Sequence, residues 1–147
     1  MRSCNLIQIS YSGGNLLYRL FHARRKPGFA VFKPNDMRIL YNIFFPLPGF
    51  SAMMLFGTIF ARRSAKPLSA RTINHEAIHK AQALADFKKG SEKRNRRAWF
   101  RYYAAYLRQW MKYGYRAMPF EREAYDNAGN LTYLETRPAN NWKQYVN

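Results

Sequence analysis

The sequence predicts an α+β fold in which a small N-terminal β-sheet is followed by three helices. Two observations support this prediction. Short apolar runs separated by turn residues occupy residues 1–65, whereas residues 69–129 have helix-forming composition and aromatic residues at helical spacing. The 147 residues fit a single domain, 1–147, and the content of 48% hydrophobic and 17% aromatic residues is enough for a buried core.

Apolar runs between turn residues predict the strands. Phe29–Phe32 and Leu55–Phe60 are the runs that we assign to strands. Clusters of Gly, Pro, Ser, Asn and Asp predict turns at 12–14, 26–28, 33–36 and 46–49. None of these clusters resembles an interdomain linker.

One segment, from Leu40 to Ala61, carries no charged residue and is long enough to span a bilayer as a helix. The prolines and glycines at 46, 48, 49 and 57 would break such a helix where lipid offers no hydrogen-bond partner. We therefore expect a turn at 46–49 between two buried strands, or a loop that faces a membrane.

Three helices are expected in the second half. The first runs from Ser69, a good N-cap after Pro67, to about Lys89, with Gly90 as its stop. In the second, aromatic residues fall at helical spacing from Trp99 to Tyr113. Pro119 suits the first turn of a third helix that ends near Gly129, and a short element at Trp142–Tyr145 closes the chain.

The first helix contains His75-Glu76-Ala77-Ile78-His79, the H-E-x-x-H pattern. Histidines four residues apart lie on one helical face and can bind one Zn²⁺ through their ring nitrogens. Glu76 lies about 100° around the helix, where it can reach a water on the metal and act as general base. The alternative is that both histidines are ordinary helix residues, one of them buried and hydrogen-bonded.

A catalytic zinc site needs a third protein ligand. The long H-E-x-x-H-x-x-G-x-x-H pattern is absent, since Gln82 and Ala85 occupy its Gly and last His positions. His22 belongs to a basic stretch far upstream and is more typical of a surface residue. The third ligand should then be a carboxylate.

Six acidic residues follow His79 in the sequence. Asp86 lies about 10 Å farther along the same helix, too far to share the ion, and Glu92 lies in a basic connector. Glu121 and Glu123 open the third helix, whose N-terminus favours an ionised carboxylate. We choose Glu121 as third ligand, with Glu123 as the alternative; a third possibility is that both are simple helix N-terminal charges.

These motifs resemble the gluzincin peptidases, in which a helix with H-E-x-x-H is followed by a helix with a ligand Glu and an Ala three residues later. Glu121 and Ala124 match that pattern, whereas Tyr125 stands where many gluzincins have Asp, so Asp126 is a substitute that can accept a hydrogen bond from a ligand histidine.

The chain is also similar, over residues 40–135, to a group of small uncharacterised bacterial proteins of metallopeptidase type. The shared strings are Leu68-Ser69, Thr72-Ile73-Asn74-His75-Glu76-Ala77-Ile78-His79, Ala81-Gln82 and Phe120-Glu121-Arg122-Glu123-Ala124-Tyr125. The resemblance implies a minimal zincin-like core, a Zn²⁺ cofactor and hydrolysis of a peptide or protein substrate. Glu76 would accept a proton from a water activated by the ion and pass it to the leaving amine. By analogy, Leu55–Phe60 would pair with an extended peptide.

Charge points to an anionic partner. The chain has 25 Lys and Arg against 8 Asp and Glu, a formal net charge of +17. Basic residues from Lys88 to Arg101 lie beside Trp99, Phe100 and Tyr102, so a nucleic-acid-binding module is the main alternative function. Binding to an anionic membrane surface is a third possibility, compatible with peptidase activity.

The N-terminal segment and the cysteine content bear on location. The single cysteine, Cys4, excludes an intrachain disulfide, and the first residues make a poor secretory signal. We expect a cytoplasmic protein, either free or associated with a membrane.

Overall fold

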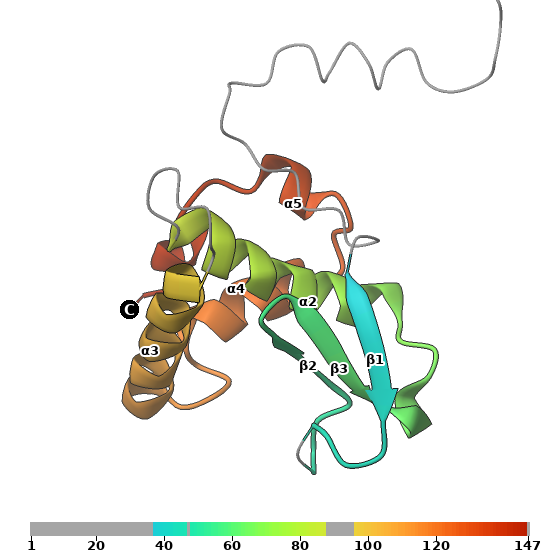
Figure 1. Ribbon diagram of the computed structural model, residues 1–147. Helices are drawn as coiled ribbons and strands as arrows, with labels where there is room; N and C mark the ends of the chain where they lie inside the picture. The colour runs from blue at the N-terminus through green and yellow to red at the C-terminus, as the bar shows by residue number, and fades with distance from the viewer. Residues whose placement is uncertain (1–36, 47, 88–95, 147) are drawn as a thin grey trace, which may run out of the picture.

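The computed structural model describes residues 37–46, 48–87 and 96–146. A three-stranded sheet precedes a set of helices, which confirms the α+β prediction (Figure 1). The expected strand Phe29–Phe32, the turns before residue 37, the helix stop at Gly90, Cys4 and His22 lie outside the described residues.

The sheet has the strand order β1-β3-β2. Strand β1 (Arg38–Asn42) pairs in parallel with β3 (Thr58–Arg62), and β2 (Ala52–Leu55) pairs antiparallel with the other side of β3. Strand β2 is therefore an edge strand of the described sheet.

The prediction of one strand at Leu55–Phe60 is wrong. The run turns at Phe56-Gly57, where both residues have positive φ (48° and 84°), as a two-residue type I′ hairpin requires. Gly57 adopts a positive φ without steric cost. Phe56 is not a residue type that favours a positive φ, so the sequence did not indicate a turn here. Phe56 is held from outside the hairpin, since its N–H donates to the hydroxyl of Tyr103 at 2.9 Å.

The uncharged segment from Leu40 to Ala61 forms strands and turns. The side chain of Asn42 accepts hydrogen bonds from the N–H groups of Phe44 and Phe45 and turns the chain out of β1. A turn at Pro48-Gly49, with Gly49 at φ 93°, leads towards β2. Within the described residues, no helix is long and apolar enough to cross a membrane.

Helix α2 (Ala70–Ala81) begins as predicted, because the Ser69 side chain accepts a hydrogen bond from the N–H of Thr72 at 3.1 Å. It continues into the π-helical segment η3 (Gln82–Asp86), so the regular helix is shorter than the predicted 69–89. A π-helical turn is wider than an α-helical one and changes the direction in which the following side chains point. Its first residue, Gln82, contacts the candidate site.

The other predicted helices are present. Helix α3 (Arg96–Tyr113) carries the aromatic residues, and helix α4 (Pro119–Asn127) has Pro119 in its first turn. The 3-10 helix η4 (Asn141–Tyr145) is the expected C-terminal element. Two short elements were not predicted: the 3-10 helix η2 (Arg63–Ala65) and the one-turn helix α5 (Tyr133–Thr136).

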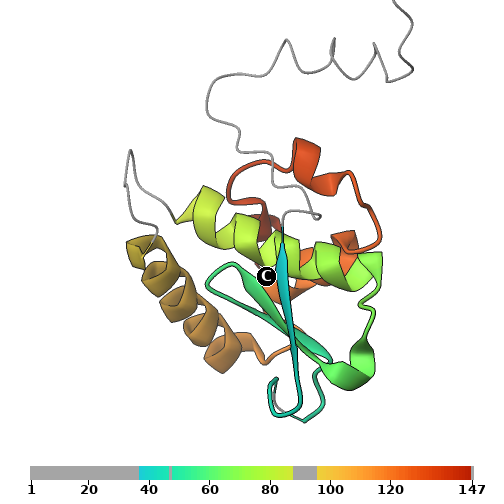
Figure 2. The same ribbon diagram turned by 45° about the vertical axis from the view of Figure 1, so that its right-hand side comes forward.

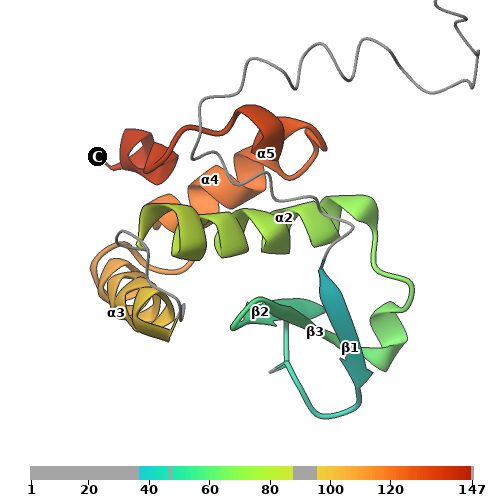
Figure 3. The same cartoon turned by 45° about the horizontal axis from the view of Figure 1, so that its top comes forward.

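Helix α2 is the central layer of the fold. It lies between the sheet on one side and α4 with α5 on the other, as Figure 3 shows. Helix α3 packs at the C-terminal end of α2 and beside the sheet (Figure 2). The fully buried Ile59, Ile78 and Phe120, from β3, α2 and α4, join these layers into one core.

Asn74 fixes α4 to α2. Its side chain is fully buried, and its Nδ2 lies 2.9–3.2 Å from the carbonyl oxygens of Asn127 and Ala128 at the end of α4 and of Asn130 just after it. These last carbonyls of a helix lack partners within the helix. One polar side chain therefore sets how the helix with the histidines lies against the helix with Glu121.

Candidate metal centre

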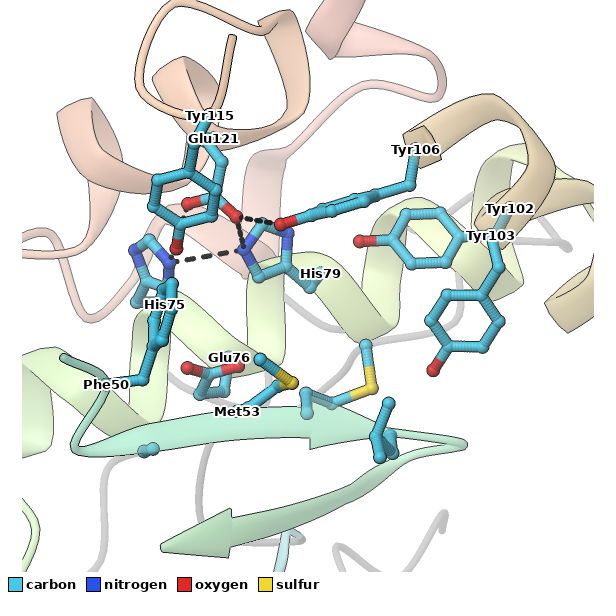
Figure 4. Close-up of a pocket in the computed structure, with 13 residues that line it drawn as sticks. Phe50, Met53, His75, Glu76, His79, Tyr102, Tyr103, Tyr106, Tyr115 and Glu121 are labelled. Atoms are coloured by element: carbon cyan, nitrogen blue, oxygen red, sulfur yellow. Dashed lines mark hydrogen bonds and ion pairs between the residues drawn. The ribbon is translucent and has the colours of Figure 1, made fainter. Parts of the chain in front are cut away.

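Helices α2 and α4 bring His75, His79 and Glu121 together (Figure 4). The Nε2 atoms of the two histidines are 3.2 Å apart. Oε2 of Glu121 is 3.3 Å from Nε2 of His75, and its Oε1 is 3.2 Å from Nε2 of His79. The two ring nitrogens and the carboxylate thus face one another, and one ligand atom from each of the three residues can be chosen so that all three lie within 4.8 Å of one another.

The spacing of these atoms fits a tetrahedral ion. Ligands about 2.0–2.1 Å from a tetrahedral Zn²⁺ lie roughly 3.3–3.4 Å from one another. The two ring nitrogens are 3.2 Å apart, and each lies 3.2–3.3 Å from one oxygen of Glu121, Oε1 for His79 and Oε2 for His75, which is close to that value. Three protein ligands with a fourth position open is the arrangement of a catalytic zinc site.

Burial and charge also favour a cation at this centre. Glu121 is 1% exposed and His79 5% exposed. Burial opposes ionisation of Glu121, but the two histidines outweigh it and hold the pKa of the carboxyl far below its usual range. Burial likewise opposes a charge on His79, yet Glu121 raises its pKa to about 9. Without a metal ion, this carboxylate therefore favours the protonated form of His79.

Gln82 decides which nitrogen of neutral His79 carries the proton. Its Oε1 is 2.8 Å from Nδ1 of His79, and its Nε2 donates to the carbonyl of Phe120 and to Oε2 of Glu123. Both amide hydrogens are therefore used, so Oε1 accepts from the Nδ1–H of His79. The lone pair of neutral His79 is then on Nε2, which faces Glu121, as a metal ligand requires.

Glu121 has an oxygen that a cation would satisfy. Its Oε1 accepts a hydrogen bond from the hydroxyl of Tyr106 at 2.7 Å. Its Oε2 is buried without a hydrogen bond in the described part of the chain, although it lies 3.3 Å from Nε2 of His75. A buried carboxylate oxygen without a donor is costly, and a bound cation removes that cost. The donor set therefore fits a divalent metal.

Glu76 lies beside the cluster. It is 6% exposed, and burial raises the pKa of its carboxyl, while His79 and His75 lower it in part. The backbone N–H of Met54 on β2 also bonds to this carboxylate. In Figure 4 its carboxylate lies between the two histidine rings and β2, in the cavity that these residues line. A buried carboxylate with a raised pKa is suited to proton transfer.

The cluster opens into a cavity of about 180 Å³ between β2, α2 and α3. Strand β2 forms one wall, and Tyr102, Tyr103 and Tyr106 of α3 form another. A second hollow of about 210 Å³ borders the other side of His75 and shares Tyr115 with the first. The candidate ligand atoms thus border a cleft that runs along β2.

Sequence reasoning did not find the tyrosines. Tyr102, Tyr103 and Tyr106 belong to the aromatic stripe of α3, whose helical spacing is typical of core packing. Burial raises the pKa of Tyr106 and Tyr115, so both hydroxyls stay protonated and can donate. The helical spacing of these aromatic residues predicts that they share the inner face of α3. It does not indicate that this face borders a cavity.

Glu123, the alternative third ligand, lies in a different network. Its carboxylate accepts from Nε of Arg137 at 2.6 Å, from Tyr133 at 2.7 Å and from Gln82 at 2.9 Å. Arg137 also donates two hydrogen bonds to Asp86, at 2.7 and 3.1 Å. The structure therefore places Glu121 with the histidines and Glu123 with Arg137.

Asp126 and Tyr125 differ from the expected roles. Asp126 was expected to accept a hydrogen bond from one of the two histidines, but it is exposed, and Gln82 lies beside Nδ1 of His79 instead. The expectation fails because residues five apart on α4 cannot both face α2. Tyr125, which departs from the gluzincin pattern, packs its ring on His75 with centroids 4.7 Å apart.

Comparison with known proteins adds nothing to this geometry: no family model, curated protein or solved structure matches the chain. The resemblance to gluzincins rests on the residues themselves.

Proposed function

We propose that this protein is a zinc-dependent metallopeptidase of gluzincin type that hydrolyses peptide bonds. His75, His79 and Glu121 would hold the ion, and Glu76 would be the general base. The observation that carries the proposal is the convergence of His75, His79 and Glu121, whose ring nitrogens and carboxylate oxygens approach to 3.2–3.3 Å, at a cleft that the Glu76 carboxylate also lines.

A zinc ion in this position would supply Lewis acidity, which lowers the pKa of a bound water towards ~7 and polarises a carbonyl group. The protein supplies the rest. Glu76 accepts a proton from the attacking water and later donates it to the leaving amine, and the raised pKa of its carboxyl makes it a better base near neutral pH. Gln82 keeps the lone pair of His79 directed at the centre, and Tyr106 orients Glu121.

The edge of β2 supports a peptide as substrate. The N–H of Arg62 donates to the carbonyl of Ser51, so the pairs Ser51–Arg62, Met53–Phe60 and Leu55–Thr58 form the ladder between β2 and β3. By alternation, the backbone groups of Ala52 and Met54 point away from β3, and both residues line the cleft. Because the N–H of Met54 already bonds to Glu76, an extended peptide would add as a further strand through the backbone groups of Ala52 and the carbonyl of Met54. The resemblance to gluzincins assigned peptide pairing to Leu55–Phe60; we now propose the outer edge of β2 in the described sheet for that role.

Tyr115 is our candidate for stabilising the developing oxyanion. Its ring borders both hollows, and Figure 4 places its hydroxyl beside His75 and directed into the cleft. A neutral phenol in a partly buried site is a strong hydrogen-bond donor to a developing negative charge. Burial keeps the pKa of Tyr115 above its ordinary value, so the donor proton stays in place.

The test is hydrolysis of fluorogenic peptides by the purified protein, with Glu76→Gln as the variant and Glu135→Gln as the control. Glu135 is exposed on α5. We expect wild-type activity to vanish with a chelator and return with zinc. Glu76→Gln should lower the rate by at least about 100-fold with its zinc content unchanged. Activity that persists in Glu76→Gln or in chelator would contradict the proposal.

A further inference from the structure

Helix α3 is apolar on two opposite sides. Its inner face is buried in the core and cavity wall through Ala98, Trp99, Tyr102 and Gln109. On the outer face, Phe100, Ala104, Leu107 and Met111 follow one another at intervals of four, three and four residues. This interval keeps side chains on one helical face. We call these four residues the outer stripe.

The outer stripe is exposed. Phe100 is 67%, Leu107 50% and Met111 74% exposed. At 1.5 Å per residue the stripe is about 16 Å long. Figures 1 and 2 show α3 at the side of the molecule, where no other described element covers its outer face. A continuous apolar row of this length on a helix marks an interaction surface.

Further apolar groups widen the surface. Trp110 is 51% exposed on the same helix. Phe56, 62% exposed at the tip of the β2-β3 hairpin, packs its ring on Tyr103 with centroids 5.3 Å apart. Aromatic side chains at the rim of an apolar surface are typical of groups that lie at a lipid–water interface.

The charge around the stripe is of one sign. From Arg96 to Met118 the sequence has six basic residues and no Asp or Glu. Arg97, Arg108 and Lys112 are exposed and follow the outer stripe along one flank, at about 50–110° from its centre. A basic flank beside an exposed apolar row is the pattern of a helix that lies on an anionic membrane.

We propose that the outer stripe of α3 binds an anionic lipid surface, with Leu107 and Met111 among the acyl chains and the basic flank at the headgroups. A second copy of the chain is a poorer occupant, because two helices that carry only positive charge would face each other and each chain has a net charge of +17. This inference does not depend on the proposed hydrolysis.

Nucleic acid also fits the chemistry of the surface less well. Trp99 and Tyr102, two of the aromatic residues that base stacking would use, are only 6% and 2% exposed. Contact with a nucleic-acid phosphate does not stabilise an exposed aliphatic side chain such as Leu107. Contact with lipid acyl chains does, because it removes the side chain from water. The lipid surface is the partner that uses both the apolar and the basic residues.

Binding to a membrane through the outer stripe would also set how far the cavity lies from the lipid. The opposite face of α3 contributes Tyr102 and Tyr106 to the cavity wall. A helix is about 10 Å across, so docking through the outer stripe would hold the cavity about one helix diameter from the headgroups.

The test is cosedimentation of the purified protein with vesicles of equimolar phosphatidylglycerol and phosphatidylcholine, and with vesicles of phosphatidylcholine alone. The variant is Leu107→Ser with Met111→Ser. The control is Leu131→Ser, because Leu131 is also 50% exposed but lies outside α3. Circular dichroism and thermal melting confirm that each variant folds, and size exclusion chromatography measures the oligomeric state.

We expect wild type and Leu131→Ser to bind the anionic vesicles and the double variant to bind at least about tenfold more weakly, since each side chain loses the benefit of apolar burial. Arg108→Gln with Lys112→Gln should weaken binding about fivefold for each charge. Equal binding by the double variant, no binding by wild type, or a dimer that the double variant dissolves without any vesicle binding would each overturn the proposal. Binding of an oligonucleotide that is lost in the double variant, without vesicle binding, would overturn it too.

Discussion

Oε1 of Gln82 lies 2.8 Å from Nδ1 of His79, and the amide nitrogen of the same Gln82 donates to the carbonyl of Phe120 and to Glu123. The orientation of this amide is therefore fixed from α4, and with it the orientation of the imidazole ring on α2. Gln82 is the first residue of the π-helical segment η3, directly after the regular part of α2. The π-helical segment thus begins at the residue that orients the ring of His79.

Gln82→Leu should weaken zinc binding about 10- to 100-fold, because loss of the hydrogen bond to Nδ1 frees the ring and the tautomer of His79. Competition with a chromophoric chelator measures this affinity. Gln109→Leu is the matched control: Gln109 is also buried and bonds to the N–H of Phe120, but it contacts neither histidine. Equal affinity in wild type and Gln82→Leu would show that the hydrogen bond has no part in metal binding.

Tyr115→Phe should lower kcat for peptide hydrolysis about 100-fold or more and leave the zinc content unchanged, because it removes one donor to the developing oxyanion. Tyr113→Phe is the control, since Tyr113 lies at the end of α3 beside Lys112 and does not line the cavity. A variant Tyr115→Phe with wild-type kcat would remove this residue from the mechanism.

Arg137→Met should lower the free energy of unfolding by about 3–5 kcal/mol, because it leaves two buried carboxylates without their cation. Glu123 is fully buried, and the Asp86 side chain in contact with Arg137 is equally inaccessible. Urea denaturation measures the change. Arg116→Met, on an exposed residue, should change it by less than about 0.5 kcal/mol. A loss below about 1 kcal/mol in Arg137→Met would mean that the network does not stabilise the fold.

The stability of the metal-free protein should fall as pH rises above neutrality. The pKa of His79 is raised from 6.5 to about 9 in the folded state, because Glu121 outweighs burial. The folded protein then binds more protons than the unfolded chain between these values. The stabilisation is complete below about pH 6.5 and is lost as pH rises through 9, by up to about 3 kcal/mol.

Urea denaturation in chelator across this pH range measures the effect, with His79→Gln as the comparison. The variant should lack the decline, and so should the zinc-loaded wild type, because the ion takes the place of the proton. An identical decline in wild type and His79→Gln would assign it to other groups.

The elements that the sequence predicted correctly have local signals. Ser69 caps α2, and Pro119 starts α4, through interactions that involve only neighbouring residues. The spacing of His75 and His79 likewise needs nothing beyond helix geometry. Such features depend on short segments and can be predicted from a single sequence.

The features that the sequence did not predict depend on contacts between distant segments. Phe56 adopts a left-handed conformation where Tyr103, 47 residues away, accepts its N–H. Glu121 and Glu123 have equivalent sequence surroundings, but residues two apart on a helix face different ways. Arg137, far along the chain, binds Glu123 and leaves Glu121 to the histidines. The pattern of Glu121 and Ala124 favoured Glu121 in the sequence, but the hydrogen bonds that hold Glu123 elsewhere could not be predicted from residues near α4.

The measurement that tests the central claim most directly is zinc content per chain by elemental analysis, after zinc loading and removal of loosely bound metal. Wild type, His75→Ala, Glu121→Gln and Glu123→Gln are compared, with circular dichroism to show that each is folded. The account predicts one zinc per chain in wild type and in Glu123→Gln, and none in His75→Ala or Glu121→Gln. A wild-type protein without zinc, or one in which Glu123→Gln loses the metal and Glu121→Gln keeps it, would contradict the account.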